Sequence, residues 1–248
     1  MVLTAAVPVA RAWAAPEEIQ VYVDDLLTPG RVGLDVHANF VPTGDRTLDY
    51  SGQQASVGRF RFTPEFALGL TRDLEAGLYL PLGTITGTDG VRADGVKARL
   101  KFIAPRSAGQ DWFWGANFEI GRSGRRLDQN PWNAELKGIL GRRIGRWTLA
   151  ANANLDFKVS GPVSAPASLE LAAMVTYDLG GSLSVGLESY NGMGEFRRFG
   201  DLAAAEQSTY LVVNKSFGRW DLNFGIGGGY GANHDGLVLK AIIGVPID

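Results

Sequence analysis

Apolar and polar residues alternate along most of the chain after Arg31, with the two-residue period of a β-strand whose two faces meet different surroundings. The clearest segments span residues 32–40, 59–70, 96–102, 112–120 and 147–157, and weaker copies lie near 75–82, 133–143, 168–178, 183–190, 208–217, 220–228 and 237–246. Together they predict about twelve antiparallel strands, many of them close to the roughly 9–11 residues that a tilted strand needs to cross a bilayer.

The connections between these segments alternate between long and short. The long ones fall near residues 43–57, 84–94, 122–131, 159–167, 191–207 and 231–235, and the short ones near 71–74, 105–110, 145–146, 180–181 and 218–219. An up-and-down membrane barrel produces this asymmetry, because its periplasmic turns are tight and its outer loops are longer. An even number of strands also brings both ends of the barrel to the periplasmic side.

The aromatic residues indicate which strand face meets lipid. Trp112, Trp147 and Trp220 begin their segments directly after short turns, Tyr177 ends a segment just before one, and Trp132 follows a long loop. Amphipathic rings favour the membrane interface, so we expect a periplasmic-side belt and, at Trp132, an outer one. A soluble barrel of this size would enclose a cavity that these Ala, Val and Leu faces are too small to fill. The sequence therefore predicts an all-β fold, an antiparallel up-and-down transmembrane β-barrel of about 12 strands in the outer membrane of a Gram-negative bacterium.

Composition excludes several other classes of protein. The chain of 248 residues carries 24 Lys+Arg against 26 Asp+Glu, so it lacks the basic excess that nucleic acid binding requires. It has 0 Cys, which removes disulfides and thiolate metal sites. No apolar run reaches the roughly 18 residues of a membrane-spanning helix.

The N-terminus has the features of an export signal. Residues 1–10 form a short apolar run, and Ala12-Trp13-Ala14 has the small-x-small form of a signal-peptidase site. We expect residues 1–14 to be a signal peptide, truncated at its start because a basic leading region is missing. The alternative is an apolar N-terminal strand. Residues 15–30 are then expected to form a periplasmic segment before a barrel over residues 31–248.

Three features fit this barrel less well. Pro64 lies within a strand and is expected to cause a bulge or an offset, because it cannot donate a ladder hydrogen bond. The alternation in residues 208–217 is ambiguous. The chain ends on Ile247-Asp248, whereas such barrels usually finish on an aromatic residue that helps the barrel-assembly machinery insert them.

Two stretches carry a resemblance to a known family. One contains Glu18-Ile19-Gln20-Val21-Tyr22, Asp24-Asp25, Pro29-Gly30 and the run from Gly33 to Asn39, and the other runs from Thr63-Pro64-Glu65-Phe66 through Gly69-Leu70-Thr71 to Leu74–Pro81. Together they resemble uncharacterised proteobacterial outer-membrane proteins labelled as transporters, akin to a barrel family linked to phenol degradation. The resemblance covers the first third of the chain. It implies a barrel at the cell surface and brings no substrate or functional residues.

The polar face, assigned to the lumen, carries many charges. Candidate lumen-lining residues are Asp35, His37, Arg59, Arg61, Glu65, Lys97, Arg99, Lys101, Glu119, Asp156, Glu170 and Glu188. Closing the sheet would set a basic wall from the early strands partly opposite an acidic wall from the middle strands. Such a field could screen solutes by charge, as charged rings do in pores. Alternatively, the charges pair and fill the interior, since twelve strands lie between a filled and an open barrel.

Other chemistry finds little support in the sequence. His37 could act as a base in a lipid-acting enzyme, but no Ser stands in an evident nucleophilic setting beside it. Asp24-Asp25 with His37 has no metal-ligand spacing, and the glycine run 225–231 lacks the helix of a dinucleotide site. We expect no catalytic residue, no metal and no cofactor.

The function expected from the sequence is therefore a passive pore or facilitator for small solutes. Its other expected partners are outer-membrane lipid and lipopolysaccharide, which the loop residues 195–199 could contact. The alternatives are an outer-membrane enzyme acting on lipid and a closed structural barrel whose outer loops bind partners.

Overall fold

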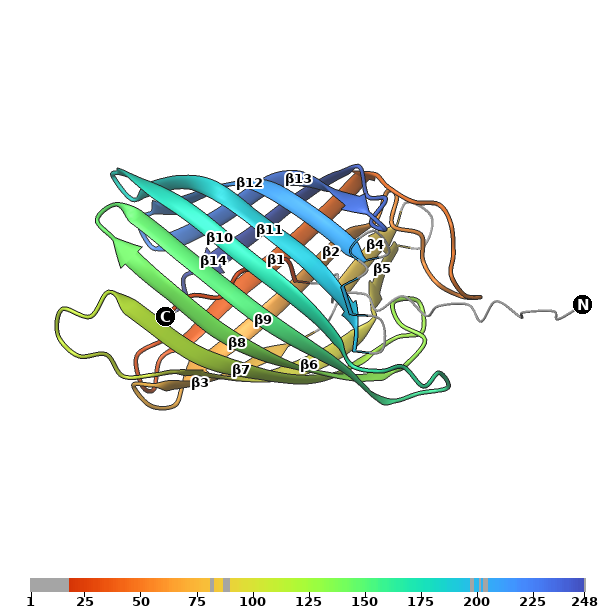
Figure 1. Cartoon of the computed structure of the whole chain (residues 1–248), viewed down its shortest axis with the longest axis horizontal. Coiled ribbons are helices and arrows are strands. Elements are labelled where there is room, and N and C mark those ends of the chain that lie inside the picture. The colour runs from red at the N-terminus through yellow and green to blue at the C-terminus, as the bar shows by residue number, and fades with distance from the viewer. Residues whose placement is uncertain are drawn as a thin grey trace, which may run out of the picture.

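The computed structural model in Figure 1 describes residues 18–80, 83–86, 90–196, 199–200, 202 and 205–247, so the expected signal peptide lies outside the described residues. Fourteen strands are present: β1 (Val32–Thr43), β2 (Phe60–Gly69), β3 (Leu74–Tyr79), β4 (Gly83–Thr86), β5 (Gly90–Ala93), β6 (Gly95–Ile103), β7 (Trp112–Ser123), β8 (Trp132–Ile144), β9 (Trp147–Ser160), β10 (Ser168–Gly180), β11 (Leu183–Glu195), β12 (Glu206–Phe217), β13 (Trp220–Gly231) and β14 (Leu237–Val245). Within these described residues there is no helix with the length and apolar character needed to span a membrane.

Twelve of these strands, all except β4 and β5, form a closed antiparallel barrel. Each strand pairs with its neighbours in the sequence, and β1 closes the sheet by pairing with β14, where Ala38 lies opposite Ala241. Closure leaves the barrel without an open sheet edge, and every strand satisfies its backbone hydrogen bonds on both sides. The predicted transmembrane barrel of about 12 strands is confirmed.

The link expected as a loop at residues 84–94 is instead a hairpin, so that expectation was wrong. β4 pairs with both β2 and β5. β2 pairs with β3 through Glu65–Gly69 and with β4 through Phe60–Phe62. Between these pairings the Leu80 N–H donates to the Pro64 carbonyl at 3.0 Å. The ladder is therefore interrupted beside Pro64, as its missing N–H predicts.

The tight turns gather at one end of the barrel, together with the start of β1 and the end of β14 (Figure 1). Between β10 and β11, Gly181 and Ser182 both have positive φ, at 61° and 58°. Two consecutive positive φ values define the type I′ turn, whose twist matches that of the two flanking strands. The long connections lie at the opposite end, so the predicted asymmetry between the two ends is present.

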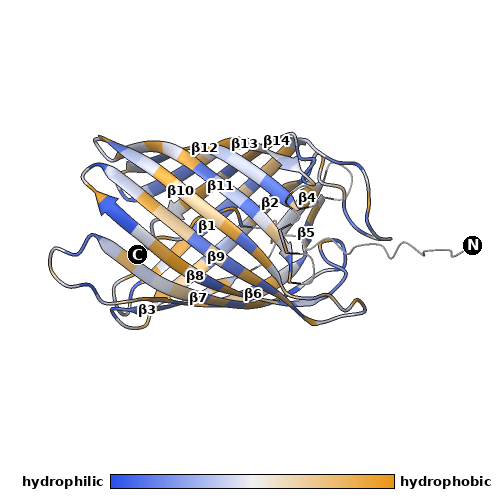
Figure 2. Ribbon diagram, in the orientation of Figure 1, coloured by the Kyte–Doolittle hydropathy of each residue, from blue (hydrophilic) through white to orange (hydrophobic). Residues whose placement is uncertain are grey.

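The outer face of the barrel is apolar, and the alternation is visible along the strands in Figure 2. In β12, where the sequence was ambiguous, Tyr210 and Val212 are buried inside, whereas Leu211 is 64% exposed on the outer surface. Trp112, Trp147 and Trp220 open strands at the tight-turn end, with Trp147 against Tyr177 at 4.7 Å between ring centroids. Trp132 opens β8 at the other end. These positions suit the two predicted interface belts, whose contact with lipid stays a prediction.

A charge placed on this outer face tests its contact with lipid. In lipid bilayers, we expect Leu211→Arg to lower the free energy of unfolding by about 2–4 kcal/mol, because Leu211 lies in the middle of the outer face of β12. Leu48→Arg, in the exposed loop between β1 and β2, is the control and should change it little. Equal effects of the two substitutions in denaturant titrations would contradict a lipid-facing β12.

Candidate functional site

The strand alternation turns every candidate lumen residue toward the barrel interior. Buried there are His37, Arg59, Arg61, Glu65, Lys97, Lys101, Glu119 and Glu188, and partly buried are Asp35, Arg99, Asp156 and Glu170. The inward direction predicted for these side chains agrees with the structure, whereas their role in a solute pathway stays a prediction.

The main feature of the interior is a segment of the chain itself. Residues 18–30 run inside the barrel before β1 begins, and Val21 and Tyr22 are buried there. The Tyr22 N–H donates to Asn152 Oδ1 at 2.6 Å, and Asn152 Nδ2 donates to the Tyr22 carbonyl at 3.0 Å. This paired contact with a side chain of β9 resembles one step of a β-ladder. The expectation that residues 15–30 form a periplasmic segment outside the barrel therefore differs from the structure over residues 18–30.

The side chain of Tyr22 is held at both its hydroxyl and its ring. The hydroxyl lies 2.8 Å from the Tyr79 hydroxyl and donates to Glu119 Oε1 at 3.1 Å. Lys137 Nζ lies 4.0 Å and Lys101 Nζ 5.0 Å from the centre of the Tyr22 ring. Cations favour the face of an aromatic ring, so this one side chain connects β3, β6, β7 and β8.

Ion pairs and hydrogen bonds hold the segment on either side of Tyr22. On one side, Glu18 pairs with Lys97 at 3.2 Å and the Ile19 carbonyl accepts from Lys240 Nζ at 2.9 Å. On the other side, Asp24 lies 2.7 Å from Arg106 and 2.5 Å from Arg143, near the tight-turn end.

The last part of the segment lies close against the wall. Lys101 Nζ donates to the Asp25 carbonyl at 2.8 Å, and the Leu27 N–H donates to Glu75 at 2.7 Å. A Cβ at Gly69 would lie 2.4 Å from the Thr28 carbonyl oxygen, so a side chain there would displace the segment. Glycine at this wall position gives the backbone of the segment the space it needs.

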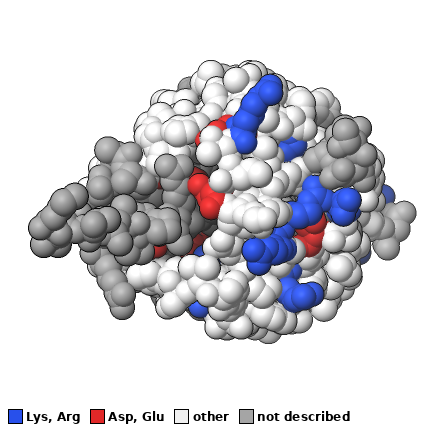
Figure 3. All heavy atoms as spheres, turned by 90° about the vertical axis from the view of Figure 1, so that its right-hand side faces the viewer, with Lys and Arg blue, Asp and Glu red and all other residues white. Residues whose placement is uncertain are grey.

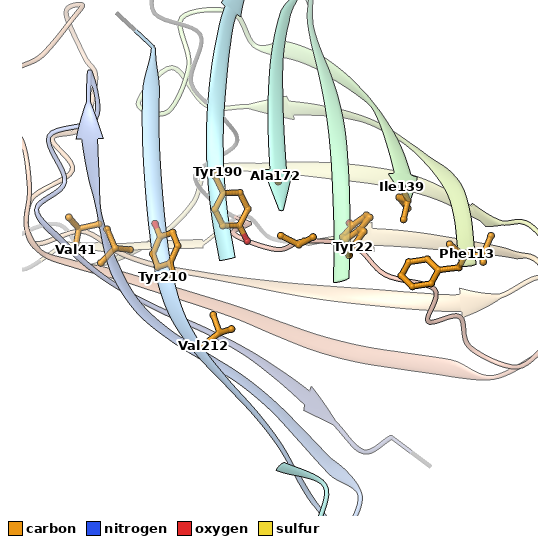
Figure 4. Close-up of a cluster of buried hydrophobic side chains, with 12 residues drawn as sticks. Tyr22, Val41, Phe113, Ile139, Ala172, Tyr190, Tyr210 and Val212 are labelled. Carbon is orange, nitrogen blue, oxygen red and sulfur yellow. The ribbon is translucent and has the colours of Figure 1, made fainter. Parts of the chain in front are cut away.

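The interior also contains an apolar cluster, which was not predicted from the sequence. Figure 4 shows Phe113, Ile139, Tyr190 and Tyr210 pointing inward from different strands, with Tyr22 of the segment among them. Phe113 lies over Gly141, where a Cβ would come within 2.0 Å of its ring. The apolar residues of the segment, Val21 among them, pack into this cluster.

The basic residues of β6 lie beside acidic residues of the neighbouring strands instead of facing them across the interior. Arg99 pairs with both Glu65 and Glu75, and Lys97 reaches Glu119 at 2.6 Å. Across β7, β8 and β9, Glu119, Glu135 and Asp156 lie opposite one another in register. The cations of β6 therefore contact neighbouring acids and the segment, so the expectation of a basic wall facing an acidic wall was only partly right.

His37 occupies a structural position in this network. Its Nε2 lies 3.1 Å from Glu65, which also accepts from Arg99. The other histidine, His234, lies in the loop between β13 and β14 with its Nδ1 3.3 Å from Asp45. Figure 3 views this long-loop end, where Lys and Arg side chains gather over one part of the surface.

Sequence reasoning missed the residues that hold the segment in place. Asn152, Lys240 and Tyr79 were given no role from the sequence. One signal was present, because residues 18–30 contain Glu18, Asp24 and Asp25 and no Lys, Arg or His. An acidic segment next to a strand set with Lys97, Arg99 and Lys101 could have suggested a contact between them.

Solved structures of outer-membrane channels share this fold. The COG4313 outer membrane channel from Pseudomonas putida F1 aligns with a TM-score of 0.60 and 15% identity, over 92% of this chain and 100% of that chain. The KdgM porin in complex with disordered oligogalacturonate gives 0.59 and 7%, over 87% and 99%. The NanC porin gives 0.54 and 12%, over 87% and 99%. Neither a protein-family model nor a curated protein sequence matches this chain.

Removing the side chain of Asn152 should loosen the segment. We expect Asn152→Ala to speed hydrogen exchange of the Tyr22 amide by roughly tenfold or more, because it removes two hydrogen bonds to the Tyr22 backbone. Asn154→Ala is the control, since the Asn154 amide donates to Glu170 at 2.9 Å. Mass spectrometry after exchange, on peptides covering residues 18–30, measures the difference. Unchanged exchange in Asn152→Ala would show that the contact with β9 does not hold the segment.

The buried pair of Lys240 with Glu188 offers a second test. We expect Lys240→Met to lower the free energy of unfolding by about 3 kcal/mol, because Glu188 keeps a buried charge without its cation. Adding Glu188→Gln should recover much of this loss. If the double variant is no more stable than Lys240→Met in denaturant unfolding, the pair does not carry the effect.

Proposed function

We propose that this protein is a passive channel for small solutes in the outer membrane of a Gram-negative bacterium. The observation that carries the proposal is the content of the barrel interior. A segment held by hydrogen bonds and ion pairs occupies much of it, together with charged wall residues, whereas a structural barrel would fill it with packed side chains. Such polar contacts can be exchanged for water and solute.

The size of the barrel supports the same proposal. Eight strands give an interior that side chains fill, and sixteen or more leave an open aqueous channel. A barrel of twelve strands lies between these two cases, and its interior carries charged residues such as Lys97, Arg99 and Glu119. Charged walls of this kind select permeating solutes by their charge.

The comparisons support a channel at the level of the fold. The three similar structures named above are channels or porins, and each aligns over most of both chains. The resemblance to outer-membrane proteins labelled as transporters, akin to a barrel family linked to phenol degradation, is compatible with this, and membership of that family belongs to the proposal. Contact with lipopolysaccharide, insertion by the barrel-assembly machinery and cleavage after Ala14 are parts of it too.

An enzyme acting on lipid is the weaker candidate. His37 is buried in the wall beside Glu65, and Glu65 also pairs with Arg99, so the imidazole has the environment of a structural ion pair. A base for lipid hydrolysis would need a nucleophile oriented beside it at the lipid surface. We therefore assign His37 to the wall of the channel.

Single-channel recording tests the proposal directly. We expect the protein, folded and inserted in a planar bilayer, to show discrete current steps of small conductance, because the segment narrows the path. A heat-dependent shift in gel mobility serves as the control for folding. Silent membranes with a correctly folded barrel would refute the channel. Retained steps and unchanged lipid turnover in His37→Ala would exclude the enzymatic role of His37.

A further inference from the structure

The segment of residues 18–30 presents only acceptors to the cations of the wall. Glu18 and Asp24 offer carboxylates, and Ile19 and Asp25 offer backbone carbonyls. Tyr22 offers the electron-rich face of its ring. The segment contains no basic residue, so it acts toward the wall as a multivalent anion with an aromatic group.

The cations that it contacts come from several parts of the barrel. They are Lys97, Lys101, Lys137, Lys240, Arg106 and Arg143. These residues lie on β6, β8, β14 and the link between β6 and β7, and are brought together only by closure of the sheet. If the segment moved away, these cations would lose acceptors that it now supplies, and an incoming anion could replace them.

The surroundings of Tyr22 indicate the shape of such an anion. The ring has Lys137 and Lys101 near it and lies within the apolar cluster that contains Phe113 and Ile139. Asp24 follows two residues later, which places a carboxylate roughly 7 Å further along an extended chain. A planar apolar body joined to a carboxylate matches this combination of ring and charge.

The segment is also attached in a way that allows it to leave. The Asp24 side chain is 4% exposed, but its two cationic partners, Arg106 and Arg143, are 36% and 47% exposed, whereas Lys97 beside Glu18 is 10% exposed. Solvent and ions therefore reach the arginine side of these pairs, where salt screens them more than it screens the pair of Glu18. The contacts nearest the tight-turn end are therefore the easiest to exchange.

The long-loop end favours the approach of anions. In the described part of that end, Arg46, Arg92, Arg122 and Arg125 are exposed, and Lys and Arg predominate over acidic residues in Figure 3. A mouth lined with one sign of charge raises the local concentration of the opposite ion.

We propose that residues 18–30 are an internal competitor of the permeating solute, and that the solutes are small organic anions, aromatic carboxylates in particular. In this scheme, which rests on the proposed channel function, an incoming carboxylate takes over cations that Glu18 and Asp24 now hold. The segment then shifts from the wall, and the path widens. The same contacts thus close the empty channel and recognise its solute.

The segment's position can be followed by thiol labelling, because the chain has 0 Cys. Val21→Cys places a single thiol at a buried position of the segment, and Leu48→Cys places one in an exposed loop as the control. With the full-length barrel in lipid vesicles, we expect benzoate to speed labelling of Cys at position 21 by about fivefold or more, a change typical of losing weak ion pairs. Benzyl alcohol and benzylammonium should leave it unchanged, and no compound should alter labelling at position 48.

A second experiment neutralises the acidic residues of the segment one at a time. Asp24→Asn should speed labelling at position 21 without benzoate, and it should shift the reversal potential in a salt gradient toward anions. Asp111→Asn is the matched control, because it removes the same charge at the same end, where Asp111 lies 3.7 Å from Arg142 and is not a partner of the segment. Glu18→Gln, on the other side of Tyr22, repeats the test in case Asp24→Asn folds poorly.

The two proposals fail in different ways. Equal labelling with benzoate, benzyl alcohol and benzylammonium, or no response to either neutralised acid, would overturn the competitor while current steps persist. If benzoate drives labelling but neither the unmodified protein nor Asp24→Asn conducts, the wall cations bind anions in competition with the segment, and the channel function is wrong.

Discussion

Closure of the sheet between β1 and β14 is the constraint on which the rest of the structure depends. Within a bilayer no water is available to an open sheet edge, so each backbone N–H and C=O must find a partner along the wall. Once twelve strands satisfy this requirement, every second side chain faces an enclosed interior. Charges that would be spread over a flat sheet then face one another, and each needs a partner or water.

The charged side chains of the interior find partners in two ways. Acids and bases on adjacent strands pair within the wall, as Arg99 does with Glu65 and Glu75. The acidic segment before β1, whose backbone is held by Asn152, gives further acceptors to cations such as Lys97 and Lys240 that also pair within the wall. The segment also brings apolar residues to the cluster around Phe113. One stretch of chain therefore supplies both the counter-charges and the apolar contacts of the interior.

These features connect stability with transport. A barrel filled by large interlocked side chains would be stable and closed, and a barrel lined only by water would be open without selectivity. Here the filling is a piece of the same chain, and in the proposed scheme an incoming anion replaces its contacts. In that scheme the pairs of Asp24 with the partly exposed Arg106 and Arg143 exchange first, and the buried contacts of Tyr22 determine where the segment returns.

The sequence alone determined the twelve strands of the barrel, the inward and outward faces of most of them and the pattern of long and short connections, because these follow from a two-residue period and local turn chemistry. It also located the interruption at Pro64, since a missing N–H is a property of one residue. It did not determine the β4–β5 hairpin or the faces of β12. It did not place residues 18–30 inside the barrel or pair Asn152 with Tyr22. Those contacts join positions 130 residues apart. Only closure of the tertiary structure creates the interior in which they meet, and no local pattern encodes which side chains will face each other across it.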